Sequence, residues 1–217
     1  MGRRFVEQRR RDPYYRAAQR EGLRSRAAYK LAYLDDRFHL LRPGARVLDL
    51  GAAPGGWSVV ALERVGPRGM VVAVDPRPVA PAPGLTVVRG RVGDPTLAPR
   101  LGSERFDVVL SDMSPSISGA YSTDHARSVE LVRSAHALAI AVLATNGAFV
   151  AKVFAGDMID ELLVEVRPNF AEVVRTKPPA SRGPSSEVYL VARGFRRALS
   201  SPRDKFPLTA ARPASDI

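Results

Sequence analysis

The sequence predicts an α/β protein in which helices cover both faces of a mostly parallel sheet of about seven strands. Short apolar runs recur along the chain without strict alternation of polar and apolar residues, which is typical of strands buried on both faces. Segments of helical length separate most of these runs, and this alternation favours a parallel sheet. The 217 residues are enough for one domain of this kind.

The elements follow from local patterns. Apolar residues recur at helical spacing from Ala27, and Arg42-Pro43-Gly44 ends that helix. The later elements are predicted as strand 46–50, helix 56–65, strands 70–75, 86–88 and 106–112, helix 124–144, strand 147–154, helix 157–166, and strands 170–175 and 187–192. No helical segment separates the last two strands, so we expect one antiparallel pairing. The arrangement is close to a Rossmann architecture.

The chain divides into three parts. Residues 1–26 are predicted to form a basic arm that leads into the first helix, residues 27–193 a single domain, and residues 194–217 a disordered basic tail rich in Pro and Arg. In the arm, Tyr14 and Tyr15 are surrounded by nine arginines: Arg3, Arg4, Arg9, Arg10, Arg11, Arg16, Arg20, Arg24 and Arg26.

Composition narrows the function classes. Lys and Arg number 33 against 22 Asp and Glu, a net charge of +11, which favours a polyanionic partner over a merely solvated Arg-rich surface. The absence of cysteine excludes disulfides, Cys-ligated zinc and thiolate nucleophiles. The chain has no apolar run near the ~20 residues of a membrane span and no secretory signal, so we expect a cytoplasmic protein.

The strongest local signal is the segment Val47–Trp57, in which a strand passes through a glycine-rich turn into a helix. Gly51 and Gly55 allow close approach of backbone to a ligand, and the helix N-terminus offers free N–H groups. Asp75 ends the next strand, where a carboxylate can accept hydrogen bonds from a ribose diol. Because the turn is not G-x-G-x-x-G, the pattern indicates an adenosine-type ligand rather than a dinucleotide. Trp57 either lines this pocket or belongs to the core.

Further motifs follow in order: Ser111-Asp-Met-Ser-Pro115, Val150-Ala-Lys-Val-Phe154 and Ser186-Glu-Val-Tyr-Leu190. With Asp49–Trp57, and with Asp12-Pro-Tyr-Tyr and Arg24–Leu31 upstream, they resemble the RrmJ/FtsJ family of S-adenosylmethionine-dependent RNA 2′-O-methyltransferases over roughly residues 12–193. The resemblance implies a class I methyltransferase fold, S-adenosyl-L-methionine as cofactor and RNA as partner. We expect a monomer that uses neither a metal nor a membrane.

The resemblance also implies a catalytic Lys-Asp-Lys-Glu tetrad at Lys30, Asp112, Lys152 and Glu187. The last three lie at or near strand ends, where parallel α/β sheets build their sites. A lysine acts as a base only where its surroundings favour the neutral amine. We expect Lys152 to take or steer the proton of a ribose 2′-hydroxyl and Asp112 to orient Lys152 beside the methyl donor. Lys30 and Glu187 would position the hydroxyl.

The residues expected to bind the cofactor are Gly51, Gly55, Trp57, Asp75, Asp94 and Asp112. Asp94 belongs to a departure from the family pattern: where the family has Gly-Asp after the third strand, this chain has Arg89-Gly-Arg-Val-Gly-Asp94, with Arg91 at the expected position. Either Asp94 contacts the adenine through a shifted loop, or backbone and apolar contacts alone hold it.

The Arg/Tyr arm, together with Arg182 in the loop before Glu187, is predicted to dock RNA. The upstream motifs look most like the bacterial ribosomal type, which implies a uridine of 23S rRNA in the 50S subunit. A tRNA 2′-O-methyltransferase and a non-catalytic RNA-binding assembly factor are the alternatives. A nicotinamide oxidoreductase is disfavoured by the turn sequence, and methylation at a pyrimidine C5 by the absence of cysteine.

Overall fold

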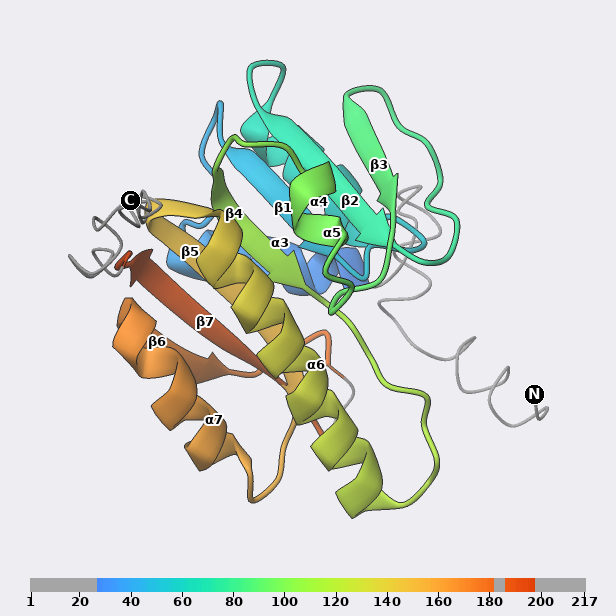
Figure 1. Cartoon of the computed structure of the whole chain (residues 1–217), viewed down its shortest axis with the longest axis vertical. Coiled ribbons are helices and arrows are strands. Elements are labelled where there is room, and N and C mark those ends of the chain that lie inside the picture. The colour runs from blue at the N-terminus through green and yellow to red at the C-terminus, as the bar shows by residue number, and fades with distance from the viewer. Residues whose placement is uncertain (1–26, 182–185, 198–217) are drawn as a thin grey trace, which may run out of the picture.

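The computed structural model describes residues 27–181 and 186–197, so the basic arm, Arg182 and the last twenty residues lie outside the described parts of the chain. A seven-stranded sheet has the order β3-β2-β1-β4-β5-β7-β6 (Figure 1). Its strands are β1 (Arg46–Leu50), β2 (Met70–Asp75), β3 (Leu85–Arg89), β4 (Phe106–Ser111), β5 (Leu143–Phe154), β6 (Phe170–Thr176) and β7 (Glu187–Phe195). The predicted mostly parallel sheet is confirmed, and β7 is the strand that runs antiparallel to both of its neighbours.

Helices cover both faces of the sheet. Figure 1 shows α6 (Tyr121–Val142) and α7 (Ile159–Val166) in front of it and α3 (Ala27–Phe38) and α4 (Gly56–Val65) behind it. A large apolar cluster lies on each face of the sheet, and consecutive residues of β1 belong to different ones: Val47 packs with α3 and α4, and Leu48 with α6 and α7. Because strand side chains alternate between faces, buried strands need apolar residues at every position.

Three differences from the sequence predictions have local causes. The short helix α5 (Leu97–Arg100) and the single turn η1 (Arg167–Asn169) have too few residues to show a periodic pattern. Strand β5 begins at Leu143 rather than at residue 147 because Leu143 already pairs with Phe106 of β4, and the register then shifts before Ala148, where Asn146 has a φ of 64°.

The third difference corrects the boundary of the folded domain, which was predicted at residue 193. Strand β7 continues to Phe195, whose side chain is 1% exposed and whose ring centroid lies 5.5 Å from that of Phe170. The strand was predicted to end at residue 192, but β6 pairs with β7 beyond Gly194, which has a φ of +69°. The first two residues assigned to the tail therefore belong to the sheet.

Candidate active site

A cavity of about 770 Å³ opens at the carboxyl ends of the first four strands. Its walls are the turn after β1, the end of β2, residues 90–92 after β3 and residues 112–116 after β4. This is the edge at which open α/β sheets bind ligands, and it is where the sequence placed the nucleotide site.

The turn after β1 needs glycine at two positions. Gly51 has φ of +73°, and a Cβ atom there would lie 2.5 Å from Cγ of Met113, so a larger residue would separate this turn from the segment after β4. Gly55 has φ of 105° and caps the N-terminus of α4. Gly51 lines the cavity, whereas Gly55 is not among the residues that line it.

Asp49 is a buried carboxylate in the cavity wall that the sequence argument did not single out. Its Oδ2 accepts a 2.6 Å hydrogen bond from Ser58, and its Oδ1 is buried without a hydrogen-bond partner. Burial raises the pKa of Asp49 to about 7, and the nearby carboxylates of Asp112 and Asp75 act in the same direction. An unpaired buried acceptor is costly, so this oxygen suits a donor or cation from a ligand.

Asp75 ends β2 inside the cavity, as predicted. Its carboxylate accepts hydrogen bonds from the backbone N–H of Ala53 at 3.0 Å and of Arg77 at 2.8 Å, and the Arg77 guanidinium lies 3.2 Å away. Burial acts to raise the pKa of Asp75, but the Arg77 and Ala53 hydrogen bonds outweigh it and hold the pKa below its usual value. The group is thus a fixed anion at neutral pH.

The predicted role of Asp94 is not matched by its position. Its exposed carboxylate accepts hydrogen bonds from the Thr96 backbone and side chain at 2.9 and 2.8 Å, and it is absent from the cavity wall. Arg91 and Val92 line the cavity instead. Gly93, with φ of +94°, turns the chain so that Asp94 caps the following turn.

Trp57 fulfils both interpretations that the sequence left open. It is 2% exposed within the α3–α4 core, and its indole N–H donates a 2.8 Å hydrogen bond to the carbonyl of Ala27. The same side chain lines the cavity. It therefore joins α3 to the wall of the site.

The tetrad expected from the sequence forms two ion pairs. The Lys152 ammonium lies 3.1 Å from Oδ1 of Asp112 and donates a 2.8 Å hydrogen bond to the Asp112 carbonyl. The Lys30 ammonium lies 2.6 Å from Oε2 of Glu187. The side chains of Lys30 and Lys152 are only 4% and 6% exposed, so neither lysine belongs to a solvated surface.

The strand register explains this convergence. Lys152 of β5 pairs with Tyr189 of β7, and Phe154 pairs with Glu187, so Lys152 and Glu187 lie two positions apart on the same face of the sheet. That face is the one covered by α3, which contributes Lys30. Asp112 directly follows β4, the other neighbour of β5.

Tyr189 connects the two pairs and was not predicted as a site residue. Its hydroxyl donates a 2.7 Å hydrogen bond to Oδ1 of Asp112, and Lys30 lies 5.8 Å from its ring centroid. The ring is fully buried and its centroid lies 5.7 Å from that of Trp57. The motif Ser186–Leu190 contained it, but only the register shows which residues it faces.

Neither a metal site nor a membrane-spanning helix is found within residues 27–181 and 186–197. No three His, Cys, Asp or Glu side chains come together there as metal ligands. None of the helices in these parts of the chain has the length and apolar character needed to cross a bilayer.

Comparison with known proteins identifies the family of this chain and several of its relatives. Residues 23–195 match the FtsJ-like methyltransferase family. A Methanothermobacter thermautotrophicus protein named ribosomal RNA large subunit methyltransferase E is 45% identical over 201 residues, covering 90% of this chain and 95% of the relative. A Granulibacter bethesdensis protein of the same name is 48% identical over 188 residues, covering 85% and 81%. A Plasmodium falciparum crystal structure described as a ribosomal RNA methyltransferase is similar with a TM-score of 0.72 and 29% identity, covering 79% of this chain and 98% of that one.

Proposed function

The chain belongs to the FtsJ-like methyltransferase family, and from this premise we propose that it methylates a ribose 2′-hydroxyl of ribosomal RNA with S-adenosylmethionine as methyl donor. The substrate we propose is a uridine of 23S rRNA in the 50S subunit, and the catalytic unit a single domain that ends at Phe195. The observation that supports this most directly is the convergence of the Lys152–Asp112 and Lys30–Glu187 pairs on Tyr189, beside a cavity whose wall includes Asp112.

The residues of the cavity fit the proposed cofactor. The unpartnered Oδ1 of Asp49 suits the ammonium group of its methionine part, and the carboxylate of Asp75 suits a ribose diol. Gly51 and Trp57 would form the wall, and Arg91 and Val92 would flank the adenine in place of Asp94. When bound, S-adenosylmethionine supplies an electrophilic methyl group. Titration calorimetry should detect its binding and no binding of a nicotinamide dinucleotide.

The tetrad residues would prepare the substrate hydroxyl. Lys152 Nζ would take or steer the proton of the 2′-hydroxyl, which requires the neutral amine at that moment. Asp112, bound to both Lys152 and Tyr189, would hold this amine in place. Lys30 and Glu187 would position the ribose, and such alignment removes several kcal/mol from a reaction barrier.

The deciding experiment is transfer of a tritiated methyl group to 50S subunits that lack the modification, to free 23S rRNA and to tRNA in parallel. We expect label in the 50S sample, recovered as 2′-O-methyluridine after digestion, and transfer at least about 100-fold slower with Lys152→Ala. Label confined to tRNA would identify the alternative tRNA enzyme. RNA binding without transfer to any substrate would identify a non-catalytic assembly factor and overturn the proposal.

A further inference from the structure

Two large apolar side chains are exposed on the segment that joins Asp112 to α6. Ile117 is 65% exposed and Tyr121, the first residue of α6, is 60% exposed. The other large apolar side chains that are exposed within the described residues lie on β3, on α7 and near the far end of α6. A patch of exposed apolar side chains on a monomer surface can mark a binding site.

The side chain of Tyr121 is exposed, but both its hydroxyl and its ring make contacts within the protein. Its hydroxyl donates a hydrogen bond to the carbonyl of Ala155, and its ring stacks on that of His125 with centroids 6.5 Å apart and an interplanar angle of 15°. Aromatic rings that are held in this way lose little conformational entropy when a ligand binds to their free face.

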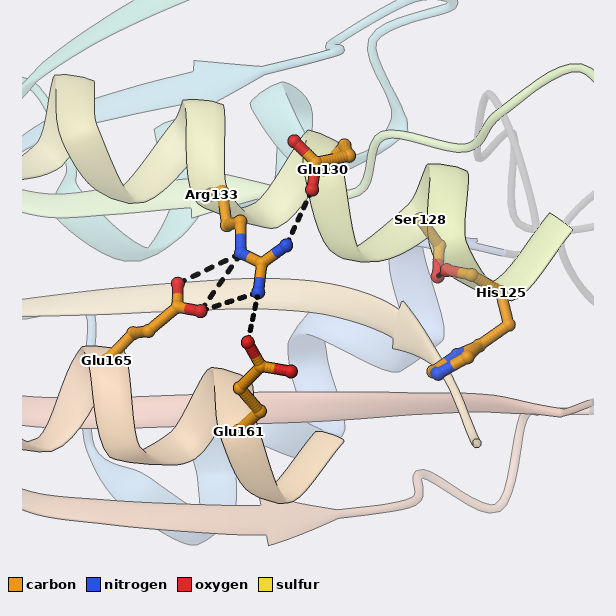
Figure 2. Close-up of polar contacts among 6 residues, drawn as sticks. All are labelled: His125, Ser128, Glu130, Arg133, Glu161 and Glu165. Carbon is orange, nitrogen blue, oxygen red and sulfur yellow. Dashed lines mark hydrogen bonds and ion pairs between the residues drawn. The ribbon is translucent and has the colours of Figure 1, made fainter. Parts of the chain in front are cut away.

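The His125 ring, on which Tyr121 stacks, is itself held by hydrogen bonds. His125 is 2% exposed, its Nδ1 lies 2.9 Å from the Phe154 carbonyl, and its Nε2 accepts a 3.1 Å hydrogen bond from the backbone N–H of Met158. These partners require the neutral tautomer with a proton on Nδ1. Figure 2 shows the His125 ring pointing from α6 toward the end of β5.

The segment before Tyr121 is also ordered by its own contacts. The Asp124 carboxylate accepts hydrogen bonds from the Ser118 backbone at 2.8 Å, the Ser118 hydroxyl at 2.8 Å and the Gly119 backbone at 3.1 Å. Arg127 is exposed and donates a 3.5 Å hydrogen bond to the carbonyl of Ser116. A cation therefore lies beside the same loop.

This ordered loop lies at the rim of the tetrad. Ala155, the acceptor for Tyr121, directly follows Phe154, and Phe154 pairs with Glu187 in the sheet. The backbone N–H of Ala155 donates a 2.7 Å hydrogen bond to Ser186, the residue before Glu187. Tyr121 is thus attached to the backbone beside the residue that we propose positions the substrate ribose.

We infer that Tyr121 is a stacking platform for a nucleobase adjacent to the target nucleotide, with Ile117 extending the apolar surface and Arg127 contacting a nearby phosphate. This inference rests on the proposed function, because it assumes an RNA strand that enters at the tetrad. Every base has a π face, so the platform would position the strand without reading its sequence. A fixed ring and an arginine in the first two turns of α6, with an apolar side chain on the loop before it, suit single-stranded RNA, and the net charge of +11 favours such a polyanion.

The first test is RNA affinity of the full-length protein, measured by fluorescence anisotropy with an RNA hairpin that contains the target nucleotide. We expect Tyr121→Ala to weaken binding about 5- to 150-fold, the range for one stacked base, and Tyr121→Phe to retain most of the affinity. The matched control is Ile140→Ala, an exposed apolar truncation on the same helix, 19 residues and about 28 Å further along. The dissociation constant for S-adenosylmethionine should remain at the wild-type value in all three variants, and a cooperative melting transition in each should show that the fold is retained.

The second test separates stacking from a structural role. In RNAs with a single abasic nucleotide at each position beside the target, one position should weaken binding to the wild-type protein and have no further effect on Tyr121→Ala. Unchanged affinity of Tyr121→Ala, or equal losses at every abasic position in both proteins, would overturn the inference. If wild-type protein transfers no methyl group yet loses affinity at one abasic position through Tyr121, the proposed function fails and the platform stands.

Discussion

The hydroxyl of Tyr189 donates a hydrogen bond to the same Asp112 oxygen that lies 3.1 Å from the Lys152 ammonium. Asp112 is therefore held from two directions, by a fully buried ring on β7 and by a lysine on β5. A carboxylate fixed in this way can keep Lys152 in one orientation. Tyr189 does this as a positioning residue, without touching the proposed substrate.

Tyr189→Phe should lower kcat about 10-fold, since it removes one hydrogen bond to a charged group and leaves the packing of the ring in place. The KM values for S-adenosylmethionine and RNA should change little. Tyr33→Phe is the matched control: its hydroxyl accepts a 2.9 Å hydrogen bond from Arg37 at the surface of the helix that bears Lys30. Equal kcat values for Tyr189→Phe and the wild type would show that Asp112 needs no second anchor.

Lys152→Ala should lower kcat by about 10²- to 10⁴-fold, the range expected when a general base is removed. Single-turnover methyl transfer measures this directly. Binding of S-adenosylmethionine should persist, because Lys152 does not line the cavity. Wild-type turnover by this variant would refute the mechanism and leave the fold assignment intact.

The Lys30–Glu187 pair should behave as a unit. Lys30→Ala leaves a largely buried carboxylate without this partner, and Glu187→Ala leaves a buried ammonium, so each single variant should lose both thermal stability and kcat. The double variant should melt at a higher temperature than either single variant. Its loss of kcat should be smaller than the product of the two single losses. Strictly multiplicative losses would indicate that the two residues act independently.

The sequence predicted β1, β2 and α4 to the residue, because each is a continuous apolar or amphipathic segment bounded by Pro, Gly or charged residues. The pairing of Lys152 with Asp112 was also expected, since the resemblance to the methyltransferase family implied it. Local sequence patterns are sufficient to predict a feature that depends on a single strand or helix, such as its first and last residues.

The sequence did not predict contacts that depend on how distant segments meet. Tyr189 reaches Asp112 only through the register of β7 against β5. Oδ1 of Asp49 is unpaired because no neighbouring donor reaches it in the fold, and the sequence does not show these distances. The sequence could not decide between the two alternatives for Asp94, because the turn at Gly93 redirects the chain after the residues that line the cavity.

Asp49 should make the stability of the ligand-free protein fall as the pH rises. Its pKa is about 7 in the folded chain and 3.8 in the ordinary carboxyl, so the folded state holds the proton more tightly than the unfolded state. The stabilisation is complete below about pH 4 and is lost progressively up to about pH 7. In Asp49→Asn this loss should disappear. Melting temperatures of both proteins between pH 4 and 8 measure the difference, and parallel curves would contradict the assignment.

Arg133 should contribute pH- and salt-dependent stability between α6 and α7. Figure 2 shows its guanidinium among three carboxylates, with hydrogen bonds to Glu165 at 2.5–3.0 Å, to Glu130 at 2.6 Å and to Glu161 at 3.4 Å. Hydrogen bonds from Arg133 hold the pKa of Glu165 below its usual value of 4.5, so the stabilisation is present above pH 4.5 and is lost as the pH falls through the lowered pKa.

Arg133→Met should lower the melting temperature at pH 7 and low salt by about 2–4 °C, because exposed ion pairs contribute little individually and three carboxylates then repel one another. The difference from the wild type should narrow below pH 4.5, where the carboxylates become protonated, and at high salt, where their charges are screened. Adding Glu165→Gln should restore part of the lost stability, since it removes one of the repelling charges. A difference that is independent of both pH and salt would mean that the arginine acts through the packing of its methylene groups instead.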